Sequence, residues 1–151
     1  MFEHKVNKLS EHITQITDPT GVFLFLVEGE KEAVLIDTGV GFLGLKETVE
    51  NLTNKPVSVI LTHMHPDHAG GADAFEKVYL HPADLGMINE QNVEVRIGYS
   101  MGMLRGAVLT SADFIPAPGV DKEYLPLSNG QIFDLGGITL EIIHVPGHTP
   151  G

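Results

Sequence analysis

The first third of the chain alternates apolar and polar positions in short runs that are separated by turn residues. Three runs rich in β-branched and aromatic residues predict strands at 12–16, 22–28 and 33–37. Gly21 and the Gly29–Lys31 stretch between these runs are typical of turns. We therefore expect the chain to open as an antiparallel meander.

The spacing of apolar positions then changes. Apolar residues recur three to four positions apart over 43–52, which predicts a helix that ends near Asn54 and Pro56. The next apolar run, Val57–Leu61, contains no charged residue. Such a run is typical of a strand that is buried on both faces, so a sheet covered by helices is expected.

The middle of the chain predicts alternating helices and strands, followed by a stretch with a weaker pattern. A short helix over 69–75, a strand over 78–80 and a helix from Pro82 alternate as they do in βαβ units. Residues 84–122 show only scattered apolar residues at helical spacing, interrupted by prolines. We interpret 84–122 as a variable insertion.

Strand patterns return toward the end of the sequence. Runs at 124–127, 131–134 and 138–145 predict three strands. The Asn129–Gly130 and Gly136–Gly137 pairs between them are typical of hairpin turns. The whole pattern predicts a mixed α/β fold.

Composition and charge narrow the class of protein. A length of 151 residues with 42% hydrophobic residues favours one domain over 1–151. A net charge of -11 disfavours nucleic acid and membrane surfaces as partners. The absence of cysteine excludes disulfides, a thiolate zinc site and a cysteine nucleophile. The longest apolar run, Val22–Val27, is far shorter than the roughly 20 residues of a membrane span. With no signal peptide visible, a cytoplasmic location is expected.

Four metal-coordinating side chains fall within six residues directly after the buried strand: His63, His65, Asp67 and His68. Residues two apart in an extended segment share a face, and Pro66 favours an extended conformation at the residue before it. We therefore expect His63 and His65 to converge, while Asp67 and His68 face an adjacent second site. Imidazole and carboxylate ligands suit zinc best, although iron and manganese accept them too.

Three segments of the sequence resemble motifs of one protein family. Residues 62–71 closely resemble the H-x-H-x-D-H motif of the metallo-β-lactamase superfamily, and residues 145–151 resemble the loop that supplies its next histidine. Ile36–Gly39 looks like the Asp-Thr-Gly at a strand end in the same family. The resemblance implies an α/β fold that forms the N-terminal part of an αβ/βα sandwich.

The resemblance also implies roles for individual residues. His63, His65 and His148 would hold a first divalent metal. Asp67 and His68 would contribute to a second metal, and Asp67 would orient the attacking water as the catalytic residue.

A further carboxylate and the end of the sequence add two expectations. The resemblance makes Asp37 a buried carboxylate that steadies the ligands, while a turn or helix-cap role is the alternative. Family members continue beyond this point with a bridging Asp and a last His, which have no position here. We expect the domain to be C-terminally incomplete, hydrolytically weak alone, and prone to self-association through an exposed sheet edge.

The resemblance favours a metal-dependent hydrolase that acts on a small molecule. A metal-bound water would attack an ester, thioester or lactone-type bond, as in the glyoxalase II-like and lactonase-like branches. Two alternatives stay open: an iron-dependent redox enzyme on the same fold, and a truncated chain that binds metal without turnover. His65 argues mildly against the di-iron version, because di-iron relatives tend to place a Glu there.

Two other features have competing interpretations. The Gly39–Gly44 segment matches the G-x-G-x-x-G fingerprint of dinucleotide sites, but the strand that follows ends in Thr62 and His63 instead of an acidic residue. A glycine loop beside the metal site is therefore favoured. Arg96 and Arg105 lie in the predicted insertion, where either could bind a substrate carboxylate. A solvated helix face is the favoured position for both.

Overall fold

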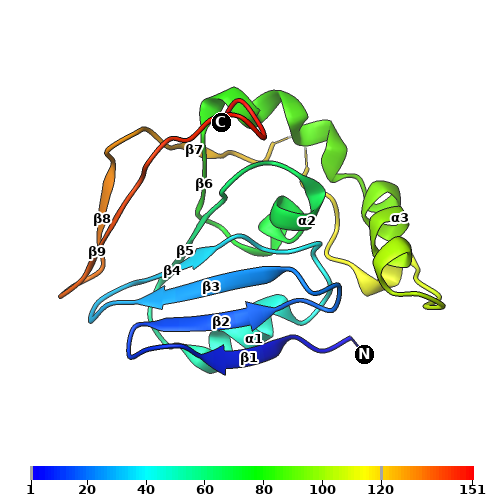
Figure 1. The fold of residues 1–151 in the computed structure, drawn as a ribbon, viewed down its shortest axis with the longest axis horizontal. Helices are drawn as coiled ribbons and strands as arrows, with labels where there is room; N and C mark the ends of the chain where they lie inside the picture. Colours follow the sequence, from blue (N-terminus) through cyan, green and yellow to red (C-terminus); the bar gives the residue numbers. More distant parts are fainter. Residues whose placement is uncertain (1, 120) are drawn as a thin grey trace.

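The computed structural model describes residues 2–119 and 121–151 and contains two sheets, with helices packed against the larger one (Figure 1). Met1 and Val120, which belong to the expected domain and insertion, lie outside the described residues. The larger sheet has seven strands whose spatial order follows the sequence: β1 (Lys5–Lys8), β2 (Ile13–Thr17), β3 (Phe23–Glu28), β4 (Ala33–Ile36), β5 (Val57–Ile60), β6 (Val78–Leu80) and β7 (Leu125–Pro126).

Strand direction changes in the middle of this sheet. Strands β1 to β4 pair antiparallel, which confirms the predicted meander, and β4 to β7 pair parallel, as βαβ connections require. The sequence pattern did not predict β1, because its side chains are all exposed and carry no alternation. Strand β5 lies between β4 and β6, as expected for a run without charge.

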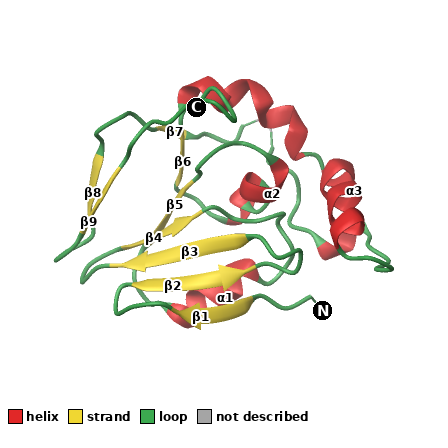
Figure 2. Cartoon of the chain, in the orientation of Figure 1, coloured by secondary structure: helices red, strands yellow, loops and turns green. Residues whose placement is uncertain are grey.

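Helices connect the parallel strands along the chain, and further helices occur in the predicted insertion (Figure 2). The α-helices are α1 (Leu45–Leu52), α2 (Pro66–Ala69) and α3 (Val93–Met103), and the 3-10 helices are η1 (Ala72–Ala74), η2 (Pro82–Gln91) and η3 (Ser111–Asp113). Among the described residues, no helix combines the length and apolar character needed to cross a membrane.

The helix predicted over 69–75 is wrong in its bounds. It starts earlier, as α2 at Pro66, and a separate turn of 3-10 helix, η1, follows it. Proline fits the first position of a helix, because its φ is already helical and its missing N–H would have no partner there. The His65–His68 segment therefore turns from extended chain into helix inside the motif.

The centre of the large sheet is buried on both faces, and strand β4 shows why. Ala33 and Leu35 face a core formed with Leu45 and Val49 of α1, whereas Val34 faces a second core on the opposite side. Alternate residues of a strand point to opposite faces, so this short apolar strand contributes to two cores. The sheet is thereby fixed on both sides, and the loops at its ends have a rigid base.

The second core is covered by a two-stranded antiparallel sheet, β8 (Ile132–Asp134) and β9 (Thr139–Glu141). The predicted turn at Gly136–Gly137 joins these strands, with positive φ at both glycines. The predicted hairpin at Asn129–Gly130 is wrong, because β7 pairs with β6 in the large sheet while β8 pairs with β9. That turn instead carries the chain from one sheet to the other, and β9 is shorter than the predicted 138–145 strand.

Candidate metal centre

Three histidines meet above the carboxyl end of β5. His63 and His65 lie in the loop after this strand, and His148 lies in the last loop of the sequence. The ring centroids of His63 and His65 are 4.9 Å apart, and the His148 ring lies 4.9 Å from His63 and 4.7 Å from His65. One nitrogen from each ring lies within 4.8 Å of the others. The structure thus brings together the three side chains that the resemblance assigns to one metal.

The local chain explains why two of these rings share a side. His65 is extended, with φ -66° and ψ 149°, as expected before Pro66. Met64 between the two histidines points the opposite way and is fully buried in the first core. Burial of Met64 therefore turns His63 and His65 together toward the solvent side of the loop.

His63 has the clearest feature of a metal ligand. Its Nε2 atom is buried, and no hydrogen-bond partner for it occurs among the described residues. Its Nδ1 atom is hydrogen-bonded to the Thr62 hydroxyl at 3.0 Å. Burial is the main cause that lowers the pKa of His63 to about 4; the neighbouring imidazole of His68 contributes to this shift and Asp37 opposes it. A neutral imidazole with an unpaired buried nitrogen fits a cation at this place.

His65 and His148 complete the cluster. The Nδ1 atom of His65 lies 3.0 Å from Nε2 of His148. The half-buried His65 and the exposed His148 each offer one ring nitrogen within 4.8 Å of a ring nitrogen of His63. Three imidazoles without a carboxylate form a donor set that zinc, iron and other divalent metals accept, with a position left open.

Asp37 links the strand end to His68. This buried aspartate has a positive φ of 63°, uncommon outside glycine, and accepts hydrogen bonds from the Thr62 main-chain N–H at 2.7 Å and from His68 Nδ1 at 2.8 Å. Burial is the largest single influence and lowers the pKa of His68, but the hydrogen bond to Asp37 and the negative charges of Asp37 and nearby carboxylates together outweigh it, so the pKa lies above its usual value. Asp37 thus fixes the ring so that Nε2 stays free to face the centre.

Asp67 and His68 lie beside the three-histidine cluster instead of in it. The His68 ring is 4.1 Å from the His63 ring, and His68 Nε2 lies 3.6 Å from Asp67 Oδ2. The Tyr99 hydroxyl donates to the same carboxylate oxygen at 3.2 Å. Burial, together with the charge of Asp67, raises the pKa of Tyr99 to about 12. No local sequence pattern links Tyr99 to Asp67, because the two residues lie 32 positions apart along the chain.

The glycine-rich segment after β4 packs against the histidine loop. A Cβ atom on Gly41 would lie 2.3 Å from the Gly70 carbonyl oxygen, so only glycine allows this approach. Gly41, the second glycine of the G-x-G-x-x-G pattern, is therefore explained by chain packing beside the centre.

Arg96 occupies a position that neither sequence-based interpretation foresaw. It is fully buried, and its guanidinium donates to the carbonyls of Gly70 at 2.8 Å, Ile115 at 2.7 Å and Val40 at 3.3 Å. Both expectations for Arg96, a solvated face and a substrate carboxylate, are therefore wrong. Carbonyl oxygens of three loops point to one place in the interior. A guanidinium has five N–H donors and can donate a hydrogen bond to each of these oxygens. Arg105 is exposed, as expected, but it lies in the turn after α3 and not on a helix face.

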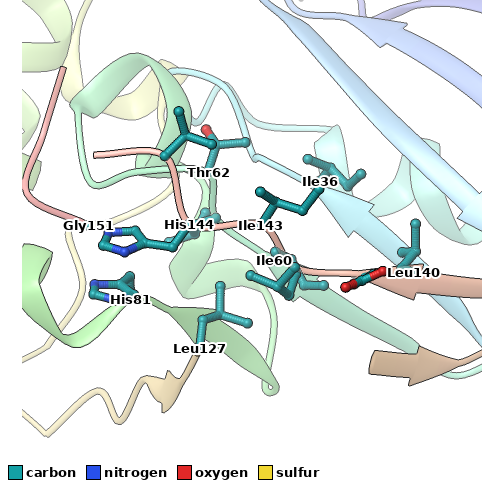
Figure 3. Close-up of a pocket in the computed structure, with 13 residues that line it drawn as sticks. Ile36, Ile60, Thr62, His81, Leu127, Leu140, Ile143, His144 and Gly151 are labelled. Carbon is teal, nitrogen blue, oxygen red and sulfur yellow. The ribbon is translucent and has the colours of Figure 1, made fainter. Parts of the chain in front are cut away.

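A cavity of about 380 Å³ separates the two sheets (Figure 3). Its wall is mostly apolar and includes Ile36, Ile60 and Leu140, with the stacked rings of His81 and His144 at one end, 4.1 Å apart. The described residues that line it do not include His63, His65 or His148. The cavity therefore lies within the second core, and the three histidines do not line it.

Comparison with known sequences gives a family and several relatives. The family model for the metallo-beta-lactamase superfamily matches residues 17–151. An uncharacterised protein of Mycobacterium tuberculosis is 36% identical over 127 residues, covering 80% of this chain and 52% of the relative. The acyl-coenzyme A thioesterase MBLAC2 of Bos taurus is 28% identical over 150 residues, covering 85% of this chain and 51% of the relative. The chain spans about half the length of the curated relatives it matches.

Comparison with solved structures supports the same fold. A metallo-beta-lactamase from Cronobacter sakazakii aligns with a TM-score of 0.66 at 21% identity, over 97% of this chain and 56% of that chain. The crystal structure of TTHA1623 in a di-iron-bound form aligns with a TM-score of 0.57 at 28% identity, over 88% of this chain and 60% of that chain.

Proposed function

Because this chain belongs to the metallo-beta-lactamase superfamily, we propose that it acts as a metal-dependent hydrolase of small molecules with ester-type bonds, thioesters first. The observation that carries the proposal is the buried, unpaired Nε2 of His63 beside the nitrogens of His65 and His148. The similarity to an acyl-coenzyme A thioesterase supports the thioester class, and an ester or lactone is the related alternative.

Each residue of the centre has a defined task in this proposal. His63, His65 and His148 would hold a divalent metal, zinc being the first candidate. When bound, such a metal supplies a lowered pKa for a coordinated water and polarises a carbonyl oxygen. Asp67, whose Oδ2 is held by the Tyr99 hydroxyl, would accept a hydrogen bond from the attacking water and so orient it.

Asp37 and His68 would support the second half of the centre. Asp37 accepts the Nδ1 proton of His68, which leaves Nε2 as the nitrogen that can serve as a ligand. The pair Asp67 and His68 therefore offers one oxygen and one nitrogen toward a second metal. Both residues also touch groups outside the cluster, so their orientation does not depend on each other alone.

An iron-dependent redox activity is the second candidate, favoured by the similarity to the di-iron form of TTHA1623. The same histidines would hold the iron. Oxidation of a substrate in the presence of oxygen, instead of hydrolysis in its absence, would distinguish this candidate from the first.

The test combines metal content with a substrate panel. The intact protein is purified without added metal, its zinc, iron and manganese are measured by emission spectroscopy, and it is assayed with acyl thioesters, aryl esters and lactones under air and under nitrogen. Hydrolysis that is retained under nitrogen and lost with a chelator supports the proposal. Bound metal without turnover of any substrate class would leave a metal-binding protein and overturn the hydrolase assignment.

A further inference from the structure

The segment next to the centre contains a buried carboxylate that the metal chemistry leaves unexplained. Asp84, in the first turn of η2, is fully buried. Among the described residues, no lysine, arginine or histidine forms an ion pair with it. A carboxylate removed from water without a cation costs free energy unless strong hydrogen bonds replace its hydration. Its partners therefore show what Asp84 stabilises.

Both partners of Asp84 are main-chain N–H groups of the ligand loops. Its Oδ2 accepts from Met64 at 3.2 Å, and its Oδ1 accepts from Gly151 at 2.7 Å. Met64 lies between the ligands His63 and His65, and Gly151 lies three residues after His148. One carboxylate thus joins the two loops that carry the three histidines, 20 and 67 residues away from it along the chain.

A second side chain of η2 hydrogen-bonds to the carbonyl group of the same residue, Met64. The amide nitrogen of Gln91, also buried, donates to the Met64 carbonyl oxygen. The N–H and the C=O of Met64 are therefore both bound by η2 side chains. The backbone of Met64 sets where its two neighbours point, so this pair of contacts restrains both His63 and His65.

The space around Gly151 agrees with a close contact. A Cβ atom at this position would lie 2.7 Å from the Asp84 carboxylate, so a side chain would push the two segments apart. Figure 1 shows the C-terminal segment, in red, lying against the green η2 segment.

We propose that Asp84 and Gln91 are positioning residues, which hold the loop of His63 and His65 and the loop of His148 at the separation that binds a metal. The helix η2, at the start of the predicted insertion, would then be part of the metal centre's support. This inference rests on the proposed three-histidine site and on no particular reaction. Among the described residues, neither side chain hydrogen-bonds to a histidine of the cluster, so their effect on binding would pass through the main chain of Met64 and Gly151.

The test measures metal affinity and fold stability separately in the intact protein. Zinc affinity is determined by competition with a chromophoric chelator for wild type, Asp84→Asn and Asp18→Asn, and thermal unfolding is measured without metal. Asp18 is the matched control, because it is also buried and accepts main-chain N–H bonds, but from Thr20, Val22 and Val40 outside the ligand loops. We expect Asp84→Asn to weaken zinc binding by about 10- to 100-fold, the range for groups that orient ligands, and Asp18→Asn to leave it within about threefold.

Two further variants keep the test decisive if Asp84→Asn does not fold. Gln91→Met removes the donor to Met64 and retains a similar shape, and Gly151→Ala pushes against Asp84 without altering it. Both should weaken zinc binding and shift the visible absorption of the cobalt-substituted protein, which reports ligand geometry. Zinc affinity and cobalt spectra equal to wild type in folded variants, or equal losses in Asp18→Asn, would overturn the proposal.

Failure of the proposed function gives a different result. Wild type that binds no zinc, iron or manganese would overturn the metal site itself. Crystal structures of wild type and Asp84→Asn would then still test the positioning role. Loops around Met64 and Gly151 that keep their separation in the variant would contradict it.

Discussion

The three-histidine cluster and the Asp67–His68 pair lie side by side but are built in different ways. The cluster holds three nitrogens within 4.8 Å of one another, and the buried Nε2 of His63 has no partner among the described residues. In the pair, His68 is bound to Asp37 and Asp67 to Tyr99. The cluster therefore contains a buried nitrogen that is available to a metal, whereas both side chains of the pair already hydrogen-bond to other residues. This difference favours a tighter first metal and a role in rate for the pair.

The difference between the cluster and the pair would be contradicted most clearly if the three histidines did not bind the first metal. We expect His63→Ala and His65→Ala to weaken binding of the first metal by more than about 100-fold, since even groups that only orient ligands account for 10- to 100-fold. Metal content by emission spectroscopy checks this. His12→Ala is the control, because His12 contacts the Glu28 carbonyl away from the centre. Unchanged stoichiometry in both cluster variants would disprove the assignment.

Asp67→Asn should lower turnover without loss of the first metal, and so distinguish the role of the pair from that of the cluster. Its amide keeps the shape of the side chain but cannot serve equally as an acceptor for a water proton, so kcat should fall by about 100-fold or more. The first metal should remain bound. Turnover and metal content are measured on the same sample, and turnover equal to wild type would remove Asp67 from the mechanism.

Asp37→Asn should act mainly on stability. It weakens charge-assisted hydrogen bonds from Thr62 and His68 in a buried place, and such bonds contribute about 1.5–3 kcal/mol each. Urea unfolding of the metal-free protein should show a loss of about that size. A change below about 0.5 kcal/mol, within the range of surface substitutions, would mean that Asp37 does not fix His68.

The smallest expected effect is the order in which two imidazoles titrate. NMR of the metal-free protein should show His68 protonating above the ordinary value of 6.5 and His63 near 4. Between pH 6.5 and about 4, His63 is protonated in the unfolded chain but neutral in the folded protein. His63 therefore lowers the stability of the fold as the pH falls through this range. His68 contributes the opposite sign: its stabilisation is full below 6.5 and is lost as the pH rises through its folded pKa. The reverse order of titration would contradict this assignment.

How far the sequence predicts this structure depends on where each contact lies along the chain. Alternation and charge-free runs identify β2 to β5 because burial on one face or two leaves a local pattern. The three histidines follow from a family resemblance that pairs two distant motifs. Strand β1 leaves no pattern, since all its residues are exposed.

Arg96, Asp84 and Gln91 show what local patterns cannot contain. Their side chains hydrogen-bond to main-chain groups of remote loops: Arg96 binds a carbonyl 56 residues away, and Asp84 an N–H 67 residues away. The general expectation that charged side chains lie in water does not hold where several main-chain N–H or C=O groups meet in the interior and need hydrogen-bond partners. Such residues become visible only when the fold places those loops together.

The separation of His65 from His148, 83 residues along the chain, also bears on how the protein assembles. A metal bound by all three histidines acts as a cross-link that closes a long loop, and closure grows costlier by about 0.6 kcal/mol for each doubling of loop length. An early folding chain can offer only His63 and His65, two neighbours in sequence. We therefore expect His148 to be the last of the three histidines to reach a metal during folding, because its position depends on closure of the 83-residue loop.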